Sequence, residues 1–155
     1  MKNLFVIAIL FMSALGFSQS NKEEVELFQS LYGMDKKEVV AAFVSVDAAH
    51  KEAFWKAYDA YEVERKAIGK EKFSLLEKYA HNYGTMDTET MDDIMNDMIS
   101  LTNKTDKLQA SYYKKMKKAA GVKAASQFLQ MEYYLSAAIR TAILEEIPFI
   151  GELDK

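Results

Sequence analysis

The scarcity of helix-breaking residues constrains this chain more than any other feature of its sequence. Only one proline, Pro148, and six glycines occur in 155 residues. No stretch shows the alternation of apolar and polar residues that is typical of strands. Long runs can therefore continue as helix. We predict an all-α fold in which a long antiparallel helical hairpin packs with additional helices, as a dimeric cradle or as a bundle.

The spacing of apolar residues divides the chain into four predicted helical segments. A capping box of Asp35 and Glu38 restarts the first segment after an interruption. Asp47 and Asp87 are expected to cap the second and third segments, and Gly121 is expected to end the third. The segments are expected near residues 23–43, 47–82, 87–120 and 123–146 of a single domain that covers 21–150, with a tail at 151–155.

The second and third segments are the longest, and each would span about 50 Å at 1.5 Å per residue. The short turn between them predicts the antiparallel hairpin. Such a thin hairpin presents more apolar surface than it can cover by itself, so we expect a homodimer or a wrapped bundle.

Residues 1–18 have the anatomy of a cleavable secretory signal peptide. Lys2 supplies a positive charge, and an uncharged apolar run follows over residues 4–17. The small residues Gly16 and Ser18 fit the cleavage rule, with cleavage after Ser20 as the alternative. The run is shorter than the about 20 apolar residues of a membrane span. We therefore expect a periplasmic or secreted protein with no stable membrane anchor.

The chain contains no cysteine, which excludes disulfides, thiolate metal sites, cysteine nucleophiles and a lipid anchor on cysteine. The formal net charge of −3 gives no reason to expect a nucleic acid partner. No set of nucleophile, base and orienting residue stands out, and His50 and His81 lie too far apart to share a metal. We predict a non-enzymatic protein without a cofactor.

A stripe of methionines follows helical spacing in the third segment. Met91, Met95 and Met98 recur after four and three residues, and Met86 precedes them. Thioethers are ligands for soft Cu(I), so this stripe with its acidic neighbours is a candidate metal site. Flexible methionines also fill gaps in a buried seam, and the helical spacing favours that second interpretation.

Aromatic and basic residues supply candidates for a partner-binding surface. Packing in the core is the alternative for the aromatic residues, and stabilisation of a helix C-terminus is the alternative for the lysines. The candidates are Trp55, Tyr58, Tyr61, Tyr112, Lys114, Lys115 and Lys118.

Glu132 lies in the mostly apolar stretch 128–134, where a carboxylate is costly unless it is paired. Arg140, two helical turns farther on, and Arg65 in the second segment are the expected partners. We predict a structural ion pair at this position.

Three stretches resemble the helical periplasmic proteins related to Spy and CpxP, and the resemblance covers roughly residues 45–150. That family's LTxxQ motif has its best-placed counterpart in Val46-Asp47-Ala48-Ala49-His50, and a weaker one at residues 86–90. The stretches are FWKAYDAYEVERK at 54–66, YYKKM at 112–116 and KAASQFLQME at 123–132.

The resemblance implies long hairpins wrapped into a cradle-shaped homodimer that holds unfolded proteins without ATP, or that senses envelope and metal stress. On this basis we predict an ATP-independent chaperone or a stress-related binding protein with unfolded-protein clients. The alternatives are a metal-responsive (Cu/Zn) protein that uses the methionine stripe, and a purely structural helical protein.

Overall fold

The computed structural model describes residues 35–153, and this part of the chain is helical without any strand. The predicted all-α class is confirmed. The predicted signal peptide at 1–18 and the first predicted segment up to residue 34 lie outside the described residues. The elements are α3 (Lys36–Phe43), α4 (Lys51–Asn82), the short 3-10 helix η1 (Tyr83–Thr85) and α5 (Thr88–Leu144).

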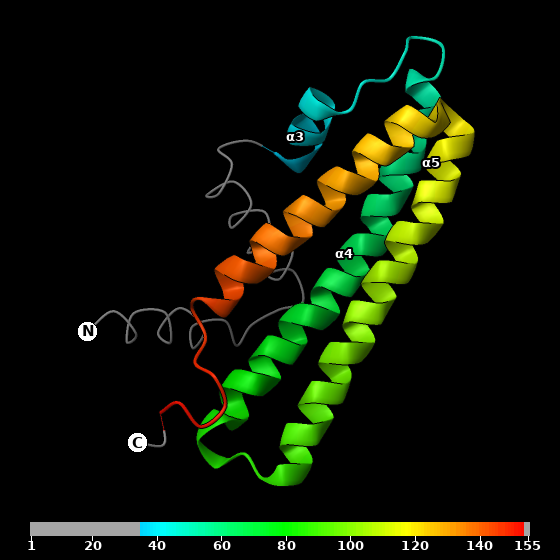
Figure 1. Cartoon of the computed structure of the whole chain (residues 1–155). Coiled ribbons are helices and arrows are strands. Elements are labelled where there is room, and N and C mark those ends of the chain that lie inside the picture. The colour runs from blue at the N-terminus through cyan, green and yellow to red at the C-terminus, as the bar shows by residue number, and fades with distance from the viewer. Residues whose placement is uncertain (1–34, 154–155) are drawn as a thin grey trace.

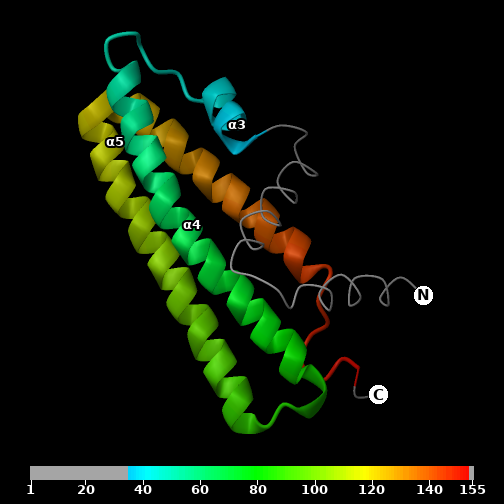
Figure 2. The ribbon, with the colours of Figure 1, turned by 180° about the vertical axis from the view of Figure 1, so that it is seen from behind.

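Helix α4 and the first half of α5 run side by side in opposite directions, joined at one end by η1 (Figure 1). The second half of α5 reverses direction at Gly121 and returns along α4, from which it diverges toward its C-terminal end (Figure 2). The short helix α3 packs against this second half. Among the described residues, no helix has a stretch long and apolar enough to span a membrane.

The reversal inside α5 depends on the backbone of Gly121. This residue has φ +82° and ψ 172°, a combination outside the helical region and essentially restricted to glycine. The third predicted segment therefore ends where the sequence places its end. The next helical stretch follows immediately, so the two halves of α5 meet at a single residue.

The helix starts agree with the sequence at two positions and differ at one. Asp87 caps α5, because its side chain accepts a 2.8 Å hydrogen bond from the Thr90 backbone N–H. The capping box at α3 is present, with the Asp35 N–H donating to Glu38 at 3.2 Å. Helix α4 starts at Lys51 and not at Asp47, and Asp47 accepts a 3.0 Å hydrogen bond from the backbone N–H of His50 in the turn that precedes the helix.

The main core lies between α4 and the two halves of α5, and Phe128 is at its centre. The Phe128 ring meets Phe54, Tyr58 and Tyr61 edge-on, with centroids 6.4, 6.4 and 5.1 Å away. Each such contact stabilises the fold by about 0.5–1.5 kcal/mol beyond the burial of apolar area. The core also contains Val40, Val44, Leu108, Tyr112, Met116, Ala124 and Ala125.

Replacing Gly121 by alanine tests the role of this residue in the reversal of α5. The added Cβ meets no atom within 4 Å, so any loss comes from the backbone conformation alone. We expect Gly121→Ala to lower the free energy of unfolding by about 1–3 kcal/mol in urea denaturation.

Gly84 supplies the matched control, because it also has open space around its Cβ but no positive φ. Gly84→Ala should change the free energy of unfolding by less than about 0.5 kcal/mol. Equal stability of the two variants would contradict a glycine-specific reversal.

Candidate functional site

A cluster of four charged side chains lies where α3, α4 and α5 meet. The Glu132 side chain, 1% exposed, has Lys36 Nζ within 2.7 Å of Oε1 and 2.8 Å of Oε2. Only the contact to Oε2 has hydrogen-bond geometry within residues 35–153, so Oε1 takes part through charge alone. Lys36 Nζ also lies 2.7 Å from Glu62, and Arg65 donates to the same carboxylate at 2.9 and 3.0 Å. Among residues 35–153, the charge cluster therefore contains two positive and two negative side chains.

The partner of Glu132 differs from both predicted arginines. Lys36 of α3 makes the ion pair, and the Tyr61 hydroxyl donates to Glu132 at 2.6 Å. Arg65 pairs with Glu62, whereas Arg140 is exposed on the surface of α5. The predicted ion pair exists, but its partner is wrong, because Lys36 is 96 positions away in the sequence and no local spacing connects the two residues.

Burial and charge shift the pKa values around the cluster in opposite directions. Burial, together with nearby carboxylates, raises the pKa of Tyr58 and of Tyr61. Burial alone would raise the pKa of Glu62, but the charges of Lys36 and Arg65 outweigh it and lower that pKa. Ion-pair networks produce such shifts without any catalytic role. The pairing of Lys36 with Glu132 and Glu62 fits a structural function that fastens α3 to the hairpin.

Three of the aromatic partner-binding candidates are core residues. Tyr58, Tyr61 and Tyr112 are 1%, 0% and 2% exposed, so they cannot contact a partner in this fold. Trp55 is half-buried and packs edge-on against Tyr58, with centroids 5.3 Å apart. The alternative interpretation, packing in the core, is correct for the three tyrosines.

The lysine candidates lie on the surface near the end of the first half of α5. Lys114, Lys115 and Lys118 are exposed. The Lys115 ammonium lies 3.8 Å from the centroid of the Tyr112 ring and 3.9 Å from the Glu64 carboxylate. Cations in the last turns before Gly121 also interact favourably with the C-terminal end of the helix dipole.

The methionine stripe does not form a buried seam. Met91 and Met95 are half-buried and Met98 is 40% exposed, while the buried positions of this part of α5 are Ile94 and Leu101. The core-seam interpretation is therefore wrong for Met98. The seven-residue spacing of the two buried residues places the methionines at the edge of the contact with α4.

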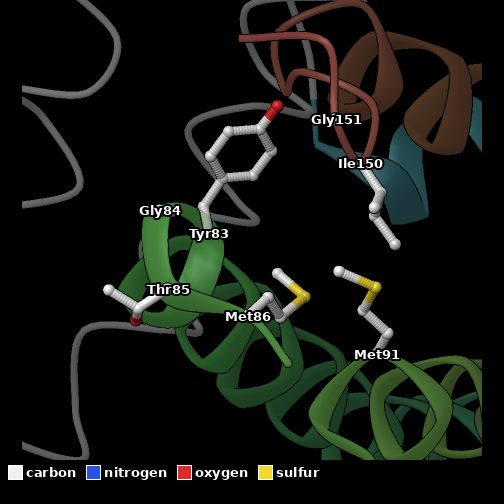
Figure 3. A pocket seen from close by; sticks show the side chains of 7 residues that line it. All are labelled: Tyr83, Gly84, Thr85, Met86, Met91, Ile150 and Gly151. Carbon is white, nitrogen blue, oxygen red and sulfur yellow. The ribbon is translucent and has the colours of Figure 1, made fainter. Parts of the chain in front are cut away.

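A pocket of about 130 Å³ lies at the turn between α4 and α5, and we call it the methionine pocket. The thioether ends of Met86 and Met91 point toward one another across it (Figure 3). Within residues 35–153, no group of three or more His, Cys, Asp or Glu residues could hold a metal ion. The pocket is lined by Tyr83, Gly84, Thr85, Met86, Met91, Ile150 and Gly151.

The surface of the second half of α5 carries few charges, a feature that the sequence predictions missed. Between residues 126 and 144, Arg140 is the only charged side chain among the exposed positions, whereas most exposed positions of α4 are charged. Tyr133 and Tyr134 are 52% and 61% exposed. We call this surface the outer face of α5, and it consists of Gln130, Tyr133, Tyr134, Ala137, Arg140, Thr141 and Leu144.

Comparisons of the chain with protein family models, with curated proteins and with solved structures find no match. The resemblance to the proteins related to Spy and CpxP stays a prediction.

Removing the positive charge at the centre of the cluster should destabilise the fold. Lys36→Met leaves Glu132 buried without its ion-pair partner, which costs about 3 kcal/mol in free energy of unfolding. The double variant with Glu132→Gln should recover most of this loss, since the buried charge is then also removed. Urea denaturation at neutral pH measures the free energy of unfolding of the single and the double variant.

Lys37→Met is the matched control, because Lys37 and Asp59 form an ion pair whose side chains are 52% and 60% exposed. Its loss should stay below about 1 kcal/mol. An equal loss for Lys36→Met and Lys37→Met would show that burial of the cluster does not matter.

Proposed function

We propose that the chain is an exported, non-enzymatic helical protein that holds apolar segments of partner proteins without ATP. The outer face of α5 is the observation that carries this proposal. Export rests on the signal-like sequence of residues 1–18. The resemblance to the proteins related to Spy and CpxP points in the same direction.

The composition of the outer face suits protein binding. Interface centres are depleted of charged residues and enriched in tyrosine and arginine. Tyr133, Tyr134 and Arg140 supply these residue types, with small or uncharged neighbours between them. Single exposed apolar residues are ordinary, but a continuous face with one charge is not. The stretch from Gln130 to Leu144 spans about 21 Å at 1.5 Å per residue, enough to contact an extended peptide.

The opposite side of the same helix supports this surface. Phe128, Glu132 and Leu135 are buried and join the second half of α5 to α3 and α4. Binding residues on a rigid helix lose little conformational entropy when a partner docks, which favours affinity. The Glu132 ion pair thus supports the binding face from behind.

Client protection tests the proposal. The purified protein, in equimolar amount, should suppress the aggregation of a chemically unfolded client, measured by light scattering without ATP. Tyr133→Ser combined with Tyr134→Ser should remove most of the suppression, because it removes both exposed aromatic rings. Circular dichroism should show that this variant keeps its helix content.

Val63→Ser is the matched control, since Val63 is 71% exposed on α4 among charged neighbours. It should suppress aggregation as the unchanged protein does. No suppression by the unchanged protein, or an equal loss in the Val63 variant, would overturn the proposal. If light scattering instead shows a stable dimer that the tyrosine variant dissociates and no client protection, the outer face joins two copies of the chain.

A further inference from the structure

The turn between α4 and α5 brings two methionines to one pocket although they lie five positions apart. Met86 follows η1, and Met91 lies in the first turns of α5. Their thioether ends face one another across a space of about 130 Å³ (Figure 3). One water molecule takes up about 30 Å³ in the liquid, so the pocket has room for an ion.

The C-terminal segment lines the pocket from the opposite side through Ile150 and Gly151. The Tyr79 hydroxyl donates to the Pro148 carbonyl and the Tyr83 hydroxyl donates to the Phe149 carbonyl, each at 2.7 Å. These bonds hold Ile150 over the pocket, where its side chain faces the two methionines (Figure 3). The hydroxyl of Tyr83 is also an acceptor for the Leu153 N–H at 3.2 Å. The walls are therefore fixed by hydrogen bonds that do not involve the sulfur atoms.

The donor atoms at the pocket are soft. Thioethers favour Cu(I), whereas Zn(II) and Mg(II) require imidazole, thiolate or oxygen ligands. The part of the chain that the structure describes offers no cluster of three such ligands. Met95, half-buried, lies four residues after Met91 on α5, and side chains at that spacing share one face of a helix about 6 Å apart. Met95 does not itself line the pocket, but helical side chains lean toward the N-terminus, which directs this third thioether toward Met91.

We propose that the methionine pocket binds Cu(I) through the thioether sulfurs of Met86 and Met91, with Met95 as the third ligand. This site is independent of the outer face of α5 and goes beyond the proposed function. Met98, which is 40% exposed two turns away from Met91, is not a ligand. The proposed copper ligands therefore lie at the turn and at the start of α5, and the methionine stripe as a whole is not the site.

Competition with a chromophoric Cu(I) chelator in the presence of ascorbate tests the site. The purified protein should withdraw one Cu(I) ion per chain. Met86→Leu with Met91→Leu should weaken binding at least about tenfold, since both pocket ligands are lost. Leucine has nearly the volume of methionine, so the variant should keep the fold, and its thermal unfolding checks this.

Met98→Leu is the matched control and should leave the affinity unchanged. In a second measurement, Ag(I) replaces Cu(I) as a redox-inert probe, and the methionine methyl signals are followed by NMR. Those of Met86, Met91 and Met95 should shift, while the signal of Met131, which packs against the core, should not. Failure to compete with the chelator, or an equal loss of affinity in the Met98 variant, would overturn the proposal.

Discussion

The buried carboxylate of Glu132 is the constraint on which the arrangement of the three helices depends. A charge that is 1% exposed must be paired, and Lys36 pairs with it from α3 while Tyr61 donates from α4. The Lys36 ammonium also pairs with the Glu62 carboxylate, and Arg65 forms a second ion pair with that carboxylate. A single network thus connects α3, α4 and the second half of α5. Since an unpaired charge would be costly, the network selects one relative placement of these helices.

The hairpin carries two different surfaces. After the reversal at Gly121, the second half of α5 turns one side to the core and keeps outward a side on which Arg140 is the one charged residue between 126 and 144. At the other end, the turn between α4 and α5 gathers Met86 and Met91 under the C-terminal segment. Each surface depends on a feature that breaks helical regularity: a glycine with positive φ in the first case, and the η1 turn in the second. Because glycine and proline are scarce in this chain, these two breaks determine where the helices reverse direction.

Local sequence signals predicted local structure well. The all-α class, the Asp87 cap, the Asp35–Glu38 capping box and the break at Gly121 each follow from residues that lie within a few positions of one another. Contacts between distant segments could not be predicted in this way. Lys36 as partner of Glu132 is the clearest case, and the burial of Tyr112 against Tyr61 is another. The sequence does contain a signal for the outer face of α5, because Glu132 and Arg140 are the only charged residues between 126 and 144. Once Glu132 is assigned to the interior, Arg140 is the one charge left for the surface of this stretch.

Photo-crosslinking tests most directly whether the outer face of α5 is the binding surface. A crosslinking phenylalanine derivative would replace Tyr133 in one sample and Val63 in another, each irradiated with an unfolded client. Client adducts are expected from position 133, and none above background from position 63. Adducts from both positions alike, or from position 63 alone, would contradict binding at the outer face of α5.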